Sequence, residues 1–239
     1  MRMKVWLQRP VFTSADELEP DDGGVRLKIR VADAALDARE AFEQGEAFVY
    51  PERVLPPGGA EEYCKAREEG VRTFVLWADR HRQRVHARVV TGSVAEGRTV
   101  TYEVLGAEGE SVAFIVRDRA LTGGGIRSRW TVQPTGGRAA VGHKGNPFWW
   151  GMWWLLLPMQ AVFFAGIALA GQGELMGTPR RTKWRVRRKT VLDWASGPSH
   201  FQLTVADDRW DPRVTAALVL LLESHSGYFG SSWDDGLRD

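Results

Sequence analysis

A cluster of basic side chains in the C-terminal part of the chain is the group of residues best suited to binding an anionic ligand. Arginine and lysine side chains attract phosphate groups, and each one close to an anionic membrane surface contributes about 1 kcal/mol to binding. The cluster directly follows the most apolar part of the sequence and comprises Arg180, Arg181, Lys183, Arg185, Arg187, Arg188 and Lys189. We therefore predict that these residues bind anionic lipid.

The alternation within this cluster predicts a strand that begins near residue 182. In such a strand Trp184 faces inward, and Lys183, Arg185 and Arg187 form one row on the outer face. Two interpretations remain open. The row either faces an anionic lipid surface or forms a solvated face whose charge prevents edge-to-edge aggregation.

The apolar stretch before the cluster runs from Pro147 to Ala170 without a charged residue. It is long enough to cross a hydrocarbon core of about 30 Å, and its aromatic side chains are typical of a membrane interface. The residues expected to anchor it in a membrane are Trp149, Trp150, Trp153, Trp154, Phe163 and Phe164.

Three arrangements of residues 147–170 are compatible with this composition. The stretch spans the membrane, enters and leaves on one face by bending at Pro158, or packs against protein as an oligomer interface. Because strands are predicted on both sides of the stretch, and a sheet cannot pair through a bilayer, we expect anchoring without crossing. The expected location is the cytoplasmic face of the cell membrane.

Residue patterns that would indicate an enzyme are weak in this sequence. The glycine-rich segment from Thr122 to Trp130 lacks the Lys-Ser/Thr ending of a phosphate-binding loop. Ser196, Ser199 and His200 lie together, but no nucleophile elbow accompanies them. We therefore predict a protein that is not an enzyme.

Candidate metal ligands are equally sparse. Cys64 is the only cysteine, and His81 and His86 lie in a segment that resembles a solvated hairpin. The acid pairs Asp207–Asp208 and Asp234–Asp235 adjoin a helix cap and a chain end, where acidic residues are common. No metal and no cofactor is expected.

Charge is unevenly distributed along the 239 residues, although the net charge is only +2. Acidic residues outnumber basic ones in residues 1–70, and basic residues outnumber acidic ones in the remainder. This asymmetry favours a basic surface that faces anionic lipid, because the overall pI of 8.8 is too mild to indicate nucleic acid. Residues 1–70 are accordingly interpreted as an acidic N-terminal section that could contribute the first strands of a barrel.

After residue 70 the sequence reads as short alternating strands joined by tight, glycine-containing turns. The segments 72–90, 98–118 and 126–145 each predict a β-hairpin, and the alternation resumes in 182–194 and 200–208. Consecutive hairpins predict an antiparallel sheet that must close or pack against another element.

The last element predicted is a helix from Pro212 to Ser224. Asp211 is a good N-cap, Pro212 is a favoured first helical residue, and the interior is apolar on every face. A helix of roughly 20 Å without a polar side is too short to span a bilayer and must be surrounded by protein. The simplest container is a closed antiparallel barrel.

These hairpins and the final apolar helix resemble the tubby C-terminal-like superfamily, which includes the LURP-one-related proteins and the phospholipid scramblases. The resemblance covers residues 71–226 and rests on the segments YEVLGAEGESVAFIV, RWTVQPTGGRAAVG, FQLTVADDRWDP and RVTAALVLLLES. It implies a twelve-stranded antiparallel barrel around a C-terminal helix, and phosphoinositide binding through a basic surface. The scramblase calcium segment and cysteine-rich palmitoylation cluster are missing, so calcium dependence and acylation are not carried over.

Together these patterns predict a mainly β protein: an acidic section at 1–70, a tubby-like barrel at 71–226 with an apolar helical insertion at 147–170, and a tail at 227–239. The expected function is that of a membrane-associated binding or scaffolding module for anionic lipid or a membrane partner. Two alternatives are a scramblase-like lipid-translocating protein and a soluble partner-binding barrel whose tryptophan-rich stretch is an oligomer interface. Nucleic acid is not an expected partner.

Overall fold

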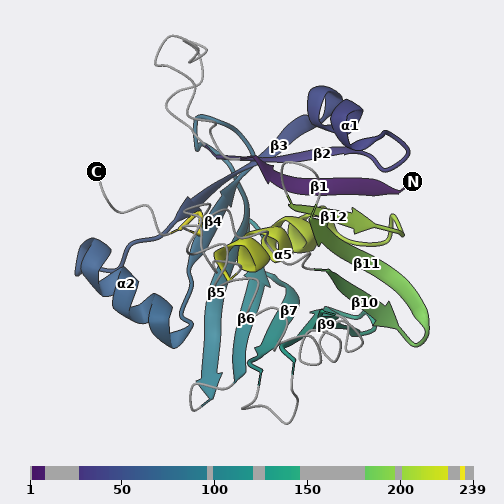
Figure 1. The fold of residues 1–239 in the computed structure, drawn as a ribbon. Coiled ribbons are helices and arrows are strands. Elements are labelled where there is room, and N and C mark those ends of the chain that lie inside the picture. The colour runs from purple at the N-terminus through teal and green to yellow at the C-terminus, as the bar shows by residue number, and fades with distance from the viewer. Residues whose placement is uncertain are drawn as a thin grey trace, which may run out of the picture.

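Twelve strands form a closed barrel in the computed structural model, which describes residues 2–8, 27–95, 99–120, 127–145, 181–196, 201–225 and 232–234. Every strand pairs antiparallel with its sequence neighbours, and β1 closes the barrel against β12 (Figure 1). The strands are β1 Met3–Gln8, β2 Lys28–Asp33, β3 Glu46–Arg53, β4 Phe74–Trp77, β5 Val85–Ala95, β6 Thr99–Leu105, β7 Ser111–Asp118, β8 Arg129–Pro134, β9 Ala140–Lys144, β10 Thr182–Val186, β11 Lys189–Ser196 and β12 Phe201–Val205. The prediction of a mainly β protein with a closed antiparallel barrel is confirmed.

Each predicted hairpin after residue 70 is present. β4 pairs with β5, β6 with β7, and β8 with β9, and the turns contain Gly109 and Gly136 at positive φ. These turns form because glycine adopts positive φ without the steric penalty of a Cβ atom.

Three strands come from the section before residue 71. β2 and β3 overlap the two candidate strand segments in this section, VRLKIRV at 25–31 and EAFVYPERV at 46–54, but the sequence did not predict β1. In β1 the consecutive residues Val5, Trp6 and Leu7 are all buried, so the strand lacks the period-two alternation of a half-buried strand. Its partner β12 lies at the other end of the sequence.

Two helices lie between the early strands, α1 Ala38–Gln44 and α2 Gly59–Glu69. Asp37 and Glu40 form a capping box at the start of α1, and Gly70 ends α2 in the left-handed conformation at φ 103°. Local capping residues therefore set the limits of both short helices.

The C-terminal helix α5, Pro212–Ser224, has the predicted bounds. The Asp211 side chain accepts a hydrogen bond from the backbone N–H of Arg213, which satisfies a free donor at the helix start. Every residue from Val214 to Ser224 is buried. The helix contacts β1 and β12 as well as β5, β6 and β7.

The two ends of the barrel differ in how the strands are connected. At the short-turn end, where α5 begins, brief turns join β4 to β5, β6 to β7, β8 to β9 and β10 to β11. At the long-loop end, where α5 finishes, residues 119–128 join β7 to β8 and residues 145–181 join β9 to β10. The apolar stretch at 147–170, predicted to be a helical insertion, lies outside the described residues but belongs to the β9–β10 connection.

Candidate lipid-binding surface

The β10–β11 hairpin carries most of the predicted basic cluster. Lys183 and Arg185 are exposed on β10, whereas Trp184 between them is completely buried. Gly142 on β9 lies against the indole ring, because a Cβ atom at this position would come within 2.8 Å of it. The inward position predicted for Trp184 is confirmed.

Arg187 does not continue this row, and the prediction of three outward cations on one strand is wrong. β10 ends at Val186, and Arg187 and Arg188 form the turn to β11, with Arg187 at φ 57°. A two-residue turn between antiparallel strands requires left-handed backbone angles, which reverse the chain after Val186. The alternation of the sequence does not reveal this turn because neither turn residue is glycine, asparagine or aspartate.

An acidic residue on β11 neutralises one end of the hairpin. Asp193 lies opposite Lys183 in the register and accepts hydrogen bonds from Arg181 at 2.9 Å (Nε to Oδ1) and 2.5 Å (Nη2 to Oδ2). The Lys183 Nζ atom lies 4.0 Å from the same carboxylate. The hydrogen bonds to Asp193 raise the pKa of Arg181. These two cations are therefore already partnered within the protein.

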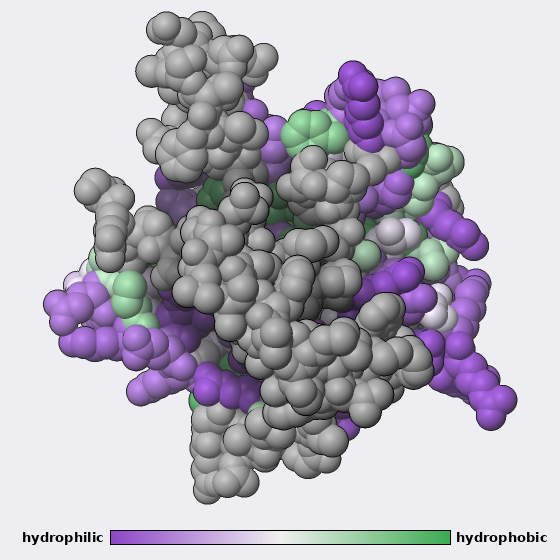
Figure 2. Space-filling view, viewed as in Figure 1, coloured by the Kyte–Doolittle hydropathy of each residue, from purple (hydrophilic) through white to green (hydrophobic). Residues whose placement is uncertain are grey.

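The remaining cations of the hairpin are available to an external anion. Arg185, Arg187, Arg188 and Lys189 are exposed and make no ion pair with another described residue. Figure 2 shows hydrophilic side chains along the right-hand edge of the molecule, where the hairpin lies in Figure 1. Arg180 lies outside the described residues.

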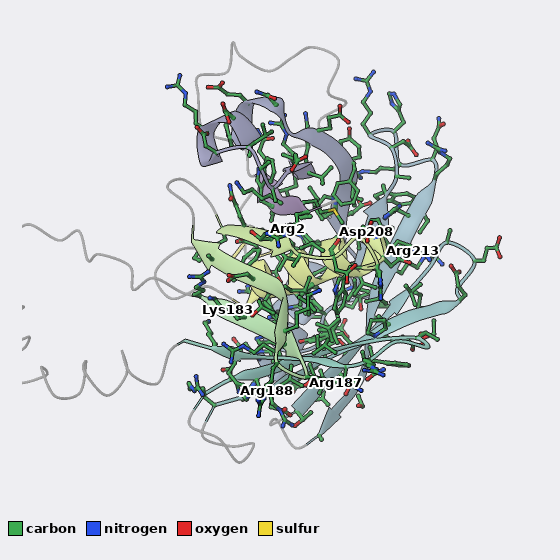
Figure 3. All side chains as sticks on the ribbon, turned by 90° about the vertical axis from the view of Figure 1, so that its right-hand side faces the viewer. Arg2, Lys183, Arg187, Arg188, Asp208 and Arg213 are labelled. Atoms are coloured by element: carbon green, nitrogen blue, oxygen red, sulfur yellow. The ribbon has the colours of Figure 1, made fainter. Side chains whose placement is uncertain are left out.

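The cluster is spread along the hairpin and does not gather at one point. Lys183 lies near the long-loop end, whereas Arg187 and Arg188 lie at the opposite end of the strand pair (Figure 3). A strand rises by about 3.3 Å per residue, so roughly 13 Å of backbone separates Lys183 from Arg187. The apolar connection therefore joins the barrel at the opposite end of β10 from the exposed turn.

The two ends of the apolar connection lie side by side. The backbone N–H of Gly145 donates to the carbonyl oxygen of Arg181 at 3.0 Å, and β9 pairs with β10 along its length. The apolar connection therefore leaves and rejoins the barrel at adjacent points. Within the described ranges, no helix has the length and apolar character needed to cross a membrane. The predicted anchor residues of 147–170 lie outside those ranges.

A buried ionic network closes the long-loop end, and no sequence pattern indicated it beyond the residue types. Asp234, which is completely buried, lies 3.2 Å from Arg72 and 3.5 Å from Arg67. Its carboxylate also accepts hydrogen bonds from Ser224 at 2.7 Å and Tyr63 at 3.1 Å. Burial and the negative charge of Asp234 raise the pKa of Tyr63. Asp234 is therefore a buried structural acid with several partners.

A second buried pair lies beside this network. The Tyr102 hydroxyl donates to the carbonyl oxygen of Gly70 at 2.7 Å and lies 2.8 Å from Nε2 of His225. A carbonyl can only accept, so the single phenol proton goes to Gly70 and the tyrosine oxygen accepts from His225 Nε2–H. Burial raises the pKa of Tyr102 to about 12. Burial and the nearby arginines lower the pKa of His225 well below its usual value, so the ring is neutral.

The residues considered for catalysis do not assemble into a site within the described part of the chain. His81 lies in the exposed β4–β5 turn, and His86 lies partly buried on β5. Among described residues, no group of three histidine, cysteine or acidic side chains could hold a metal ion. Ser199, His200 and Asp235 lie outside the described ranges.

No protein-family model, no curated protein and no solved structure matches the chain. The twelve strands agree with the number that the tubby-like resemblance implies, but a strand count by itself does not identify a family.

Proposed function

We propose that this protein is a non-enzymatic binding module that attaches to an anionic membrane surface through the β10–β11 hairpin. The observation that carries the proposal is a group of four exposed cations that have no acidic partner among the described residues: Arg185, Arg187, Arg188 and Lys189. Cations on so short a hairpin add their attractions to anionic headgroups, at about 1 kcal/mol each near the surface.

The apolar stretch at 147–170 supplies the second contact in this proposal. Its chain leaves at Gly145 and returns at Arg181, where the two backbones are hydrogen-bonded. We infer that the stretch anchors the protein to the cytoplasmic face of the membrane without carrying the chain across. The hairpin then lies along the membrane, because its cations extend from the attachment point to the far turn.

We further propose that α5 is enclosed by the barrel and that the protein is a tubby-like barrel. The strands that α5 contacts support enclosure, since β1 and β12 lie on the opposite side of the strand order from β6 and β7. Burial of Leu218, Leu220 and Leu221, each with no exposed surface, agrees with this placement. The twelve-strand count and the final apolar helix support the relationship.

Charge reversal on the hairpin tests the proposed membrane contact. The triple variant Arg185→Glu, Arg187→Glu, Arg188→Glu should bind vesicles containing phosphatidylserine about 100-fold more weakly, which is the loss of about 3 kcal/mol. Co-sedimentation with these vesicles and with neutral phosphatidylcholine vesicles gives the measurement.

A matched control changes the same net charge elsewhere. Arg39, Lys65 and Arg88 are exposed on α1, α2 and β5, and their replacement by glutamate should leave vesicle binding within about threefold of wild type once general charge effects are screened by salt. Equal losses of vesicle binding in the two triple variants would show that net charge alone accounts for the effect. That result would overturn the assignment of membrane binding to the hairpin. Unchanged melting temperatures show that both proteins remain folded.

A further inference from the structure

A pocket opens at the long-loop end of the barrel, beside the last turn of α5. The space between its walls, including the part open to solvent, is about 420 Å³. Among the described residues it is lined by Arg117, Ser128, Trp130, Lys144, Thr182, Trp194, Phe201, Leu222 and His225. These residues come from the ends of six neighbouring strands and from the end of the helix.

Arg117 is the unusual residue of this pocket. It follows the inward-facing residues Ala113 and Ile115 in the alternation of β7, so its side chain enters the barrel mouth. The guanidinium lies 5.7 Å from the ring centroid of Trp130, which faces it across the β7–β8 pair. Arg117 forms no hydrogen bond or ion pair through its side chain with another described residue.

Two acids at this end of the fold are already partnered. Asp118, the next residue on β7, accepts hydrogen bonds from Arg129 and Thr99, each at 2.7 Å. Asp234 is bound by Arg72 and the other members of its network. A partly buried cation without an acid is costly to the folded state, and proteins keep such groups mainly where a ligand supplies the missing charge.

The electrostatic environment of the pocket favours an anion. Burial lowers the pKa of Arg117 to about 10, so the guanidinium remains charged at neutral pH. Burial lowers the pKa of His225, and the positive charges of Arg117, Arg72 and Lys144 lower it further. The histidine therefore stays neutral and offers its ring without a further charge.

The opposite wall of the pocket is aromatic. The Trp194 and Phe201 rings stack with centroids 5.6 Å apart and an interplanar angle of 6°. Trp130 and Leu222 extend this surface towards Arg117, and the His225 ring lies 5.6 Å from that of Trp130. A ligand that satisfies both walls needs an anionic group and an apolar part within a few ångströms of each other.

We propose that this pocket binds a small anionic amphiphile, with its carboxylate or phosphate on Arg117 and its apolar chain or ring against Trp194 and Phe201. The site does not depend on the hairpin surface, because Arg185, Arg187 and Arg188 are not among the residues that line it.

Calorimetry on the full chain with four probes tests this proposal. The probes are octyl phosphate, octanoate, inorganic phosphate and octanol, each below its micelle concentration. Octyl phosphate or octanoate should bind at least tenfold more tightly than inorganic phosphate and than octanol, because only an amphiphile contacts both walls. No binding of either amphiphile to the wild-type protein would overturn the site. Equal binding of inorganic phosphate would show that the pocket is a site for free anions, and would overturn the proposal that its ligand is an amphiphile.

Arg117→Met removes the charge and keeps a long side chain. It should weaken amphiphile binding at least tenfold and keep or raise the melting temperature, because an unpartnered charge leaves the barrel. Arg138→Met is the control, since Arg138 is exposed in the β8–β9 turn at the opposite end. Undiminished binding by Arg117→Met would overturn the assignment. If Arg117→Met does not fold, the guanidinium is needed for the structure, and the test is made with Arg117→Lys. Amphiphile binding as tight as wild type by the folded Arg117→Lys variant would contradict recognition by the guanidinium group.

Discussion

The two ends of α5 lie in different surroundings, although one helix connects them. At the short-turn end, Asp211 caps the helix, and Arg213 pairs with Asp211 at 2.8 Å and with Glu110 at 2.6 Å, in groups that are partly exposed. At the long-loop end, Arg72 and Asp234 form a buried ion pair, and His225 is held neutral. Charge is hydrated and locally balanced at the first end, and buried at the second.

The two ends therefore differ in what their charges require of the fold. Tight turns and exposed ion pairs place few demands on the fold, because water compensates whatever the protein leaves unmatched. Buried charges are costly unless every partner is present, and such sites concentrate where a protein binds something. The long-loop end has such a network and also the pocket around Arg117, and the apolar connection joins the barrel there.

Removal of the buried acid should produce the largest stability difference between the two ends. Asp234→Ala leaves Arg72 buried without its main partner and removes the acceptor for Tyr63 and Ser224, so we expect a loss of about 3–5 kcal/mol in the free energy of unfolding. Urea denaturation measures it. Asp208→Ala, at an exposed position, is the control and should change stability by less than about 0.5 kcal/mol. A loss below about 1 kcal/mol for Asp234→Ala would show that the network does not hold the long-loop end together.

Acid should weaken the long-loop end through His225. The folded-state pKa of His225 lies below its unfolded value, so the unfolded chain binds a proton first as pH falls below about 6.5. Stability is then lost progressively towards the folded-state pKa. His225→Gln removes this titration and should reduce the loss between pH 7 and pH 5 by about 1–2 kcal/mol.

Burial also lowers the pKa values of His86 and His143, so part of the acid sensitivity should persist in the His225→Gln variant. His81→Gln is the matched control because His81 is exposed in a turn. Parallel pH profiles for wild type and His225→Gln would show that His225 is not the acid-sensitive group.

The short-turn end was more predictable from the sequence than the long-loop end. Glycine turns and alternating strands are local signals, and the helix start at Asp211 depends on neighbouring residues, so these elements were found at their observed positions. β1 was missed because all three of its central residues are buried, and the β10–β11 turn was missed because two arginines occupy it.

The long-loop end could not be predicted because its contacts join residues far apart in the sequence. Arg72 meets Ser224 and Asp234, and Tyr102 meets His225. No spacing in one sequence connects such positions. The same holds for Arg117, whose inward direction follows from strand alternation but whose missing acid partner is visible only after the barrel is closed.

The smallest of these effects is expected at the short-turn end. Asp211→Ala removes the N-cap of α5, which accepts the Arg213 backbone N–H, and one partner of the Arg213 side chain. A lost cap costs about 1 kcal/mol, and the partly exposed ion pair adds little because water and Glu110 still bind Arg213. We therefore expect a decrease of about 1 kcal/mol in the free energy of unfolding, measured by urea denaturation. Asp211→Asn is the matched control: it keeps the capping oxygen and should recover most of the loss. A loss of stability in Asp211→Ala as large as that in Asp234→Ala would contradict the contrast between the two ends. It would mean that the short-turn end depends on its charges as strongly as the long-loop end does.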